Sequence, residues 1–361
     1  MTTLAQRAEA EIANSLLSYL RGKLQNPTLT YSQAPKKITG GFDTQIFGFR
    51  LAGAPEELSG PLVVRVFRKS TDPEHALWER AVHTGIVELG FPAPSVFLAE
   101  ARAEMLGSAF VVMERLPGRI MLDMFFRPSR LFFRLSRILA ELHLRLHALD
   151  TTAFSTTLDR EGFPAAQLSV ERWNRQVLGE VLDQLPLDGL RPGLDWLSEH
   201  RPPDPARLSI CHGDFHPLNI LIDRGEVSGV IDWDSVRIAD PAYDIGATRA
   251  LFAHGPIDLP RLFQGPVNAV RRMLVRRYTS TYREQRPLDD ERIAYYEAMR
   301  CLGFLIEGSE HLLADGGVIE RPDKHTAFAS RRALEDIAAH FHELTGVEVR
   351  LPAQPEPVSR S

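Results

Sequence analysis

Residues 211–234 have the sequence CHGDFHPLNILIDRGEVSGVIDWD, and this stretch decides the fold. Two short apolar runs within it are joined by a turn that contains glycine, which predicts a β-hairpin. Asp214 and Asn219 lie where the chain enters the first strand and Asp232 follows the second, so we expect the three side chains at one end of the hairpin. Phosphoryl transfer needs such a set: one carboxylate orients the attacking hydroxyl, while an amide and a second carboxylate hold magnesium.

The pattern H-G-D-x-x-x-x-N followed by I-D-W resembles the aminoglycoside phosphotransferase and choline-kinase-like family, where it replaces two protein-kinase motifs, H-R-D-x-x-x-x-N and D-F-G. The resemblance implies an α+β, two-lobed protein-kinase-like fold with a small antiparallel-sheet lobe and a mostly helical lobe. It also implies an enzyme that transfers the γ-phosphoryl group of ATP to a hydroxyl group of a small molecule. A metallophosphoesterase would need D-x-H upstream and G-N-H downstream, and the sequence has neither.

The same resemblance implies a role for each polar residue of these motifs. Asp214 is expected to orient and deprotonate the acceptor hydroxyl. Asn219 and Asp232 are expected to hold Mg²⁺ on the phosphates of ATP, with GTP not excluded as the nucleotide. His212 and Asp244 are expected to support the loop rather than to react. If the loop were only structural, Asp214 and Asn219 would be loop caps and His212 a core residue.

Two further segments resemble the parts of this family that contact the nucleotide. Gly40 and Gly41, in ITGGFDTQIFGF, occupy a turn where backbone amides can approach phosphates. The segment ERLPG resembles the linker between the lobes, so Glu114 and Leu116 are expected to bind the adenine through main-chain groups. The chain contains neither G-x-x-x-x-G-K-[ST] nor G-x-G-x-x-G, so P-loop and Rossmann folds are not indicated.

A basic residue in the third expected strand completes the nucleotide site. Arg65, in LVVRVFR, occupies the position at which protein kinases place a lysine. A guanidinium group can hold a phosphate oxygen and a carboxylate together. Glu79 on the next helix is its expected partner, with Glu88 as the competing candidate. The alternative is an edge-strand arginine that faces solvent.

The apolar periodicity predicts helices and strands along the chain, and the family resemblance implies how they divide into lobes. Strands are expected at 36–39, 45–51, 62–67, 95–99 and 108–113, and the main helices at 4–24, 74–89, 131–150, 258–284, 289–313 and 324–345, with short helices near 167–183 and 191–200. We expect the first helix to pack on a lobe, although it could bind a partner instead. The expected regions are an N-terminal helical extension (1–30), the small lobe (31–113), a linker (114–119), the helical lobe with the catalytic hairpin (120–345) and a disordered tail (346–361).

Composition limits the classes of function. A net charge of −5 over 361 residues argues against a general nucleic-acid binder. The two cysteines, Cys211 and Cys301, suit a reducing compartment and are expected in the core. No apolar run approaches the ~20 residues that a membrane helix needs, and no secretory signal is evident. These observations predict a soluble cytoplasmic protein that binds neither nucleic acid nor membrane.

The sequence leaves the acceptor open, because two charge clusters point in opposite directions. Arg271, Arg272, Arg276 and Arg277 would suit an anionic acceptor, whereas Glu297, Glu307 and Glu310 would suit a cationic one. Amino alcohols resembling choline, ethanolamine or homoserine, and macrolides, are alternatives to an aminoglycoside. A nucleotide-binding scaffold without turnover is the competing class, and the intact catalytic motif argues against it. His143 and His147 have a spacing that can bind zinc, but without a third ligand we expect core packing.

Overall fold

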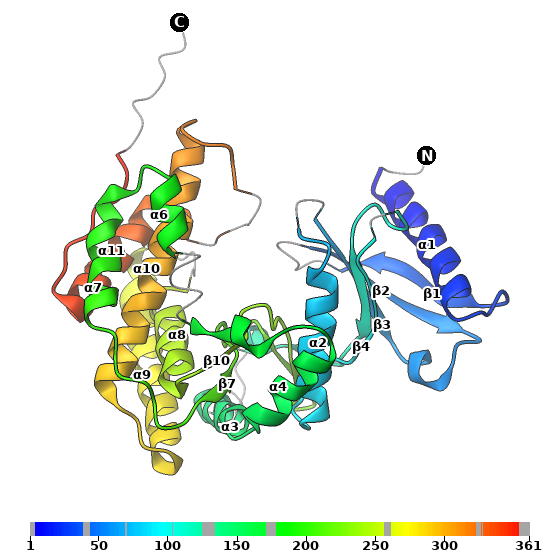
Figure 1. Ribbon diagram of the computed structural model, residues 1–361, viewed down its shortest axis with the longest axis horizontal. Helices are drawn as coiled ribbons and strands as arrows, with labels where there is room; N and C mark the ends of the chain where they lie inside the picture. Colours follow the sequence, from blue (N-terminus) through cyan, green and yellow to red (C-terminus); the bar gives the residue numbers. More distant parts are fainter. Residues whose placement is uncertain are drawn as a thin grey trace, which may run out of the picture. The chain divides into compact units, whose positions relative to one another are not determined.

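The computed structural model describes residues 4–38, 44–68, 71–102, 104–124, 134–170, 178–255, 261–322, 326 and 328–353. The chain forms two compact units, shown in Figure 1. The sheet unit comprises residues 1–121, 153–164 and 220–234, and the helical unit comprises residues 122–152, 165–219 and 235–361. The α+β architecture predicted from the motif is confirmed.

An antiparallel sheet with the strand order β1-β2-β3-β5-β4 forms the centre of the sheet unit. All five predicted strands are present: β1 (Thr30–Lys37), β2 (Thr44–Ala52), β3 (Leu62–Phe67), β4 (Val96–Glu100) and β5 (Phe110–Glu114). The first strand begins at Thr30 and not at Lys36. It is an exposed edge strand that buries only Pro35, so its first half lacks the apolar alternation by which a strand is recognised.

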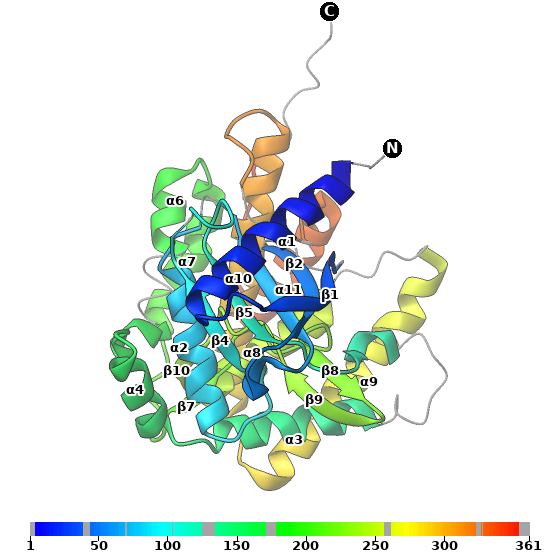
Figure 2. The same cartoon turned by 90° about the vertical axis from the view of Figure 1, so that its right-hand side faces the viewer.

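Two helices cover opposite faces of this sheet (Figure 1). Helix α1 (Leu4–Lys23) buries Leu16 and Leu20 in the cluster that contains Val64 of β3. Helix α2 (His75–Glu88) buries Ala76 in the cluster that contains Val63, the preceding residue of β3. Successive strand residues point to opposite faces, so the apolar run in β3 serves both helices. The N-terminal helix therefore packs on the sheet, as expected (Figure 2).

The predicted hairpin is present as β8 (Ile220–Asp223) and β9 (Glu226–Val230). Arg224 and Gly225 link the strands with φ of 50° and 93°, the positive values that a tight two-residue turn of this hand requires. A short strand, β6 (Arg119–Ile120), pairs with β8 and completes a three-stranded sheet.

The hairpin belongs to the sheet unit. The expectation that a helical lobe over 120–345 contains the hairpin is therefore wrong. The amide of Val230 donates to the carbonyl of Pro92 at 2.8 Å, and Gly229 leaves room for the side chain of Leu116. Helix α4 (Thr151–Arg160) also belongs to the sheet unit and packs Phe154 against Gly85 of α2. It was not predicted, because TTAFSTTLDR has only two large apolar residues to mark a helical stripe.

Long helices form the helical unit: α3 (Leu135–His147), α8 (Pro241–His254), α9 (Arg261–Gln285), α10 (Asp290–Asp315) and α11 (Arg331–Thr345). Gly246 lets α8 approach α10 closely, because a Cβ there would lie 2.6 Å from the amide nitrogen of Glu297. Both cysteines are buried, as expected. Shorter helices are α6 (Glu180–Gln184) and α7 (Arg191–Glu199), and β7 (Ser209–Cys211) pairs with β10 (Arg237–Ala239).

The chain continues to pack after α11, so the disordered tail expected from residue 346 is wrong as far as residue 353. Gly346 ends the helix with φ of 73°, and Val347, Val349 and Leu351 then contact the core. The amide of Arg350 donates to the carbonyl of Gly189 at 2.8 Å. The sequence did not predict this packing, because the alternating apolar residues form only a short segment next to a proline-rich one. Residues 354–361 lie outside the described part of the chain.

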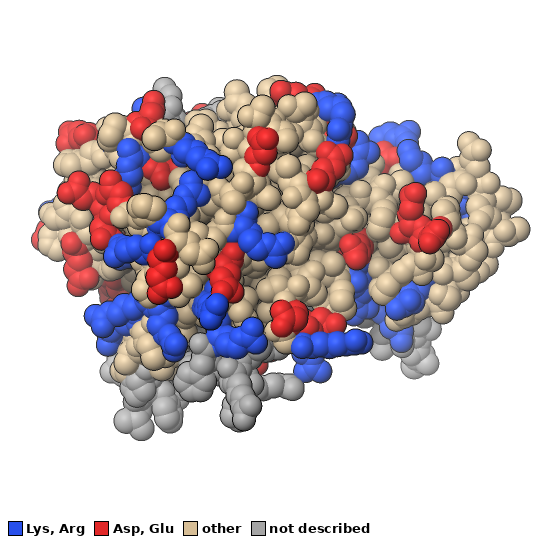
Figure 3. All heavy atoms as spheres, turned by 90° about the horizontal axis from the view of Figure 1, so that it is seen from below, with Lys and Arg blue, Asp and Glu red and all other residues tan. Residues whose placement is uncertain are grey.

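The surface carries mixed charge on the face shown in Figure 3, where Lys and Arg lie among Asp and Glu. Over the residues that the structure describes, no helix combines the length and the apolar character needed to cross a membrane.

The packing of α1 can be tested by truncating a side chain that it buries. Leu20 is fully buried, so Leu20→Ala should lower the free energy of unfolding by about 2–5 kcal/mol. Val318→Ala, at a side chain that is 56% exposed, serves as the control and should change it little. Urea unfolding of both variants measures the difference. Equal stability of the two variants would mean that α1 is not part of the sheet unit's core and is available to a partner.

Candidate active site

Asp214 lies in the loop that follows β7, and its carboxylate has three partners within the helical unit. Oδ1 accepts a hydrogen bond from Nη2 of Arg300 at 3.0 Å. Oδ2 accepts from Nδ2 of Asn219 at 3.1 Å and lies 3.2 Å from Nε2 of His216. Nδ2 of Asn219 also donates to the main-chain oxygen of Asp214 at 2.9 Å, which fixes the amide and directs its oxygen away from the aspartate.

These neighbours keep Asp214 ionised. Burial alone would raise the pKa of the carboxyl group, but His216 and Arg300 outweigh it and hold the pKa well below its usual range. The side chain is still 23% exposed, so an incoming hydroxyl group can reach it. An ionised, partly exposed carboxylate can orient a hydroxyl group and accept its proton.

A second carboxylate, Asp244 on α8, holds the backbone of this loop. It is fully buried and accepts the amides of His212 and Gly213 at 2.7 and 2.6 Å. The rings of His143 and His147 lie 3.4 and 3.2 Å from the same carboxylate. Burial would raise the pKa of Asp244, but the hydrogen bonds with the two histidines hold it well below its usual range. The expected bracing contact of Asp244 is confirmed.

The two histidines belong to the core, as expected. Nδ1 of His143 lies 2.5 Å from the hydroxyl of Tyr278, and Nδ1 of His147 lies 2.8 Å from that of Tyr282. Each ring therefore bridges a tyrosine of α9 and the carboxylate of Asp244.

Gly213 is required by the path of the loop. Its φ is 77°, in the region that favours glycine, and a Cβ would lie 2.3 Å from the carbonyl oxygen of Ser235. The loop next to it is held by His212, whose Nδ1 accepts the amide of Asp214 at 3.3 Å. His212 thus contacts the loop backbone, in line with the expected supporting role.

Asp240 begins α8, the helix that presents Asp244. Its Oδ1 accepts the amide of Ala242 at 2.9 Å, so Asp240 is the N-cap of this helix. Oδ2 forms an ion pair with Arg292 of α10 at 2.6 Å. The start of α8 is therefore tied to α10.

Within the sheet unit, Arg65 of β3 pairs with Glu79 of α2, and Nη1 lies 2.5 Å from Oε1. Arg65 is 15% exposed, so it does not face solvent. The competing candidate, Glu88, instead binds Thr157 and Arg160 of α4. Burial opposes the charge of Arg65, but Glu79 and the nearby aspartates outweigh it and raise its pKa. The predicted Arg65–Glu79 pair is confirmed, and its role toward a nucleotide stays a prediction.

Asp232 follows β9 in an unusual backbone conformation. Its φ is 68°, in the left-handed region that Asp and Asn adopt more readily than other non-glycine residues. The next side chain, Trp233, is buried, and its Nε1 donates to the carbonyl of Val230 at 3.0 Å, which holds the turn. Strained conformations of this kind concentrate at functional sites.

The remaining predicted residues have less definite surroundings. The amide of Glu114 donates to the carbonyl of Ser95 at 2.8 Å, so an adenine would have to use other main-chain groups near Glu114 and Leu116. Gly40 and Gly41 lie outside the described residues. Asp232 belongs to the sheet unit and Asp214 and Asn219 to the helical unit, so their convergence stays a prediction.

Two partners of Asp214 were not predicted. His216 stands two positions after Asp214, and this spacing inside the motif was a usable signal. Arg300 comes from α10, 86 positions along the chain, and nothing in its local sequence relates it to the loop.

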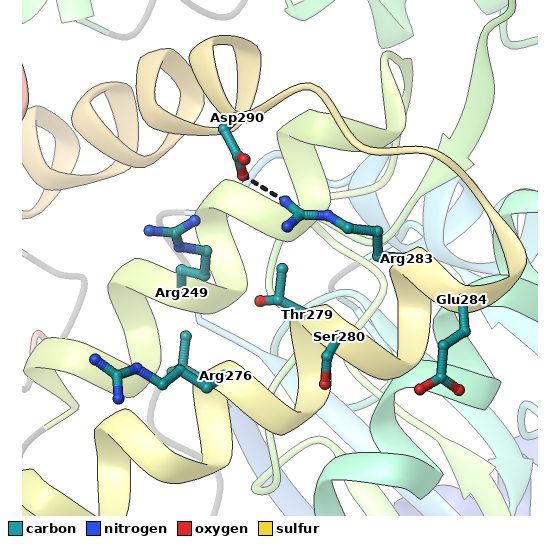
Figure 4. A pocket seen from close by; sticks show the side chains of 8 residues that line it. Arg249, Arg276, Thr279, Ser280, Arg283, Glu284 and Asp290 are labelled. Atoms are coloured by element: carbon teal, nitrogen blue, oxygen red, sulfur yellow. Dashed lines mark hydrogen bonds and ion pairs between the residues drawn. The ribbon is translucent and has the colours of Figure 1, made fainter.

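A pocket of about 490 Å³ opens elsewhere on the helical unit, between α8, α9 and the start of α10 (Figure 4). Arg276, one of the arginines considered for an anionic acceptor, lines it, but none of the residues predicted for catalysis, nucleotide or metal does. Arg283 in its wall pairs with Asp290 at 2.6 Å, and Arg249 pairs with Glu297 at 2.8 Å. Glu297 also lies 3.1 Å from Nε2 of His340. The negative charge of Glu297 is therefore balanced by Arg249 and His340, so this residue does not require a cationic acceptor.

Comparison with known sequences identifies the family. A model of the phosphotransferase enzyme family (APH) matches residues 36–288. The chain belongs to the phosphotransferase enzyme family. This phosphotransferase contains the expected motif within the matched segment, so the family resemblance is confirmed.

Curated relatives match a shorter part of the phosphotransferase. Acyl-CoA dehydrogenase family member 11 of Rattus norvegicus is 29% identical over 198 residues, and that of Homo sapiens is 26% identical over 196 residues. Each match covers 52% of this chain and 24% of the relative, so the chain spans about a quarter of these proteins.

Solved structures confirm the two-lobed protein-kinase-like fold. A putative aminoglycoside phosphotransferase from Ralstonia eutropha has a TM-score of 0.60 at 19% identity and covers 92% of this chain and 98% of its own. The aminoglycoside phosphotransferase APH(4)-Ia, in a ternary complex with AMP-PNP and hygromycin B, has a TM-score of 0.61 at 18% identity, with coverage of 93% and 100%.

The bracing role of Asp244 predicts a loss of stability with a defined pH dependence. Asp244→Asn should lower the free energy of unfolding by about 3 kcal/mol at neutral pH, because the amide cannot accept both loop N–H groups as strongly as the carboxylate. The native pKa lies below the unfolded value of about 3.9, so the stabilisation is present above about pH 4 and is lost as pH falls.

Urea unfolding between pH 7 and pH 3 measures this effect, with the exposed Asp195→Asn as the control. The difference in the free energy of unfolding between the wild type and Asp244→Asn should become smaller toward pH 3. A difference that is absent, or constant over the range, would contradict the bracing role.

Proposed function

We propose that this phosphotransferase is an ATP-dependent kinase that phosphorylates a hydroxyl group of a small molecule. The observation that carries the proposal is the Asp214 carboxylate, which the surrounding side chains keep ionised and which is fixed by Asn219 in the H-G-D-x-x-x-x-N loop. Family membership supports the reaction class. A structural neighbour that binds AMP-PNP supports ATP as the donor.

In this proposal Asp214 accepts the proton of the acceptor hydroxyl. The hydroxyl oxygen forms a bond to the γ-phosphorus, the bond between that phosphorus and the β,γ-bridging oxygen breaks, and ADP leaves with the electron pair. Arg300 and His216 hold the carboxylate in place while the proton arrives.

The residues proposed for magnesium fit that ion. Mg²⁺ prefers oxygen ligands, and when bound it neutralises charge on the phosphates. Nδ2 of Asn219 donates to the main-chain oxygen and to the carboxylate of Asp214, so Oδ1 of Asn219 is the atom left for a metal. Asp232 would supply a carboxylate from a backbone conformation that few residues adopt.

The proposed nucleotide contacts come from the sheet unit. Arg65, held by Glu79, would neutralise phosphate charge, and main-chain groups near Glu114 and Leu116 would bind the adenine. Gly40 and Gly41 would let backbone amides approach the phosphates. An amino alcohol or a macrolide remains an alternative acceptor to an aminoglycoside, and a scaffold without turnover remains the alternative class.

The proposal can be tested at Asp214. Asp214→Asn should lower turnover on the order of 10²-fold or more, because the amide cannot accept the proton. Affinity for ATP should stay close to that of the wild type, since the residue serves the acceptor. Steady-state ADP formation with an identified acceptor and nucleotide titration measure the two effects, with Asp195→Asn as the control. Wild-type turnover in Asp214→Asn would refute the assignment.

The metal role of Asp232 predicts a separate outcome. Asparagine tolerates the same positive φ, so Asp232→Asn should leave the fold of the ligand-free protein intact. The rise in melting temperature caused by ATP with magnesium should largely vanish, because binding to the native state is the source of that rise. Thermal unfolding of both proteins, with and without magnesium and ATP, decides this. A ligand-free variant that melts lower yet keeps the full ligand-induced rise would show a purely structural role.

A further inference from the structure

Arg237 is a mostly buried cation in the helical unit, and none of the described residues forms an ion pair with it. It lies on β10, and its Nη1 donates to the carbonyl of Val236 at 2.6 Å. Its Nε is buried and has no hydrogen-bond partner. In the described part of the chain, no carboxylate lies within ion-pair distance of its guanidinium. Burying a charge without a partner costs free energy, so Arg237 destabilises the folded protein.

Arg237 lies opposite Cys211 in the β7–β10 pair, at the start of the loop that carries Asp214, and the positive charge of a second arginine acts on it. Arg300 of α10 lies with its guanidinium carbon 4.6 Å from the ring centroid of Phe304 and also has a buried Nε without a hydrogen-bond partner. Burial lowers the pKa of Arg237, and the positive charge of Arg300 lowers it further. Two like charges in a mostly buried site repel each other unless an anion is placed near them.

The carboxylates near this pair compensate Arg300 but not Arg237. Asp214 binds Arg300 at 3.0 Å, and Glu307, two turns along α10, adds a second attraction. Tyr243 faces both arginines, and burial raises its pKa to about 12, so it is neutral and supplies no negative charge. Among the described residues, none therefore supplies a negative charge that balances Arg237, and a bound anion could supply it.

The position of Arg237 and Arg300 indicates whether the nucleotide or the acceptor would supply the negatively charged group. Arg300 contacts the carboxylate that the proposed reaction uses as its base, whereas the arginine proposed for the nucleotide phosphates, Arg65, belongs to the sheet unit. An anionic group of the acceptor could bind Arg237 and Arg300 while its hydroxyl group meets Asp214. The anionic group would also bind the guanidinium of Arg300, which donates to Oδ1 of Asp214. That oxygen would then be free to accept the proton of the hydroxyl group.

We propose that Arg237 and Arg300 form an anion subsite, and that the acceptor is an alcohol that carries a carboxylate or a phosphate near its hydroxyl group. This inference rests on the proposed kinase function. By this proposal Arg237 and Arg300 recognise the negative charge of the acceptor, and the arginines at 271–277 do not. Within that cluster, Arg271 already donates to the carbonyls of Ala253 and Gly255. Arginine suits the task because its planar fork matches both carboxylate and phosphate.

Matched pairs of acceptors test the subsite with the full chain. 3-Hydroxybutyrate is compared with butane-1,3-diol, and glycerol 3-phosphate with glycerol, in a magnesium-ATP assay of ADP formation and in thermal unfolding without nucleotide. The charged member of at least one pair should give the higher kcat/KM and the larger rise in melting temperature. The pair that responds distinguishes a carboxylate from a phosphate.

Two variants of Arg237 connect this preference to the residue. Arg237→Gln should raise KM for the charged acceptor by about 10- to 100-fold, the loss expected for charge-assisted hydrogen bonds, without changing the affinity for ATP. Arg237→Met should remove the rise in melting temperature caused by the charged compound. It should also melt no lower than the wild type without ligand, because it removes an unpaired buried charge. Arg283→Gln removes an equal charge from a residue paired with Asp290 and serves as the control.

The outcomes separate the subsite from the kinase function. Transfer to a neutral alcohol, with no preference for its charged counterpart and no effect of Arg237→Gln, overturns the subsite and leaves the function standing. Binding of the charged compound that depends on Arg237, without ADP formation from any acceptor, supports the subsite and overturns the function. A lower melting temperature of ligand-free Arg237→Met, or a change in ATP affinity in Arg237→Gln, also overturns the subsite. No binding and no transfer with any of the four compounds counts against both.

Discussion

The catalytic loop depends on one buried carboxylate. Asp244 accepts the amides of His212 and Gly213 at 2.7 and 2.6 Å and so fixes the backbone directly before Asp214. Its own position is set by α8, which is capped by Asp240 and tied to α10 through Arg292. A charged group with this many donors is stable in the interior, and the loop that it holds can present a second carboxylate to the surface.

In the proposed mechanism, each unit contributes its own set of residues. The helical unit supplies the proposed base, its amide neighbour Asn219 and the arginines around them, whereas the sheet unit supplies Arg65, Glu79 and Asp232. Asp214 is held by its near neighbours Asn219 and His216 and by the distant Arg300, and Arg65 is held by Glu79. In the helical unit the balance of charge around Asp214 leaves Arg237 uncompensated, and this links the geometry of the loop to the sign of the acceptor.

The sequence predicted those features that depend on local order. The hairpin and the strands of the sheet follow from apolar periodicity and turn chemistry, and the Arg65–Glu79 pair follows from the family resemblance. The exposed first half of β1 and the short helix α4 were missed because few apolar residues mark them. The assignment of the hairpin to the sheet unit, and the contact of Arg300 with Asp214, come from tertiary packing that no local pattern contains.

The central claim is that this loop performs phosphoryl transfer to an alcohol. Mass spectrometry of a panel of alcohols, incubated with the protein, magnesium and ATP labelled with ¹⁸O in the γ-phosphoryl group, tests it most directly. If the loop transfers the phosphoryl group, one chemical class of alcohol gains a single labelled phosphoryl group as ADP appears, and the gain disappears without magnesium. A protein that binds ATP with magnesium but labels no alcohol in a panel of anionic, neutral and cationic members would instead be a nucleotide-binding scaffold.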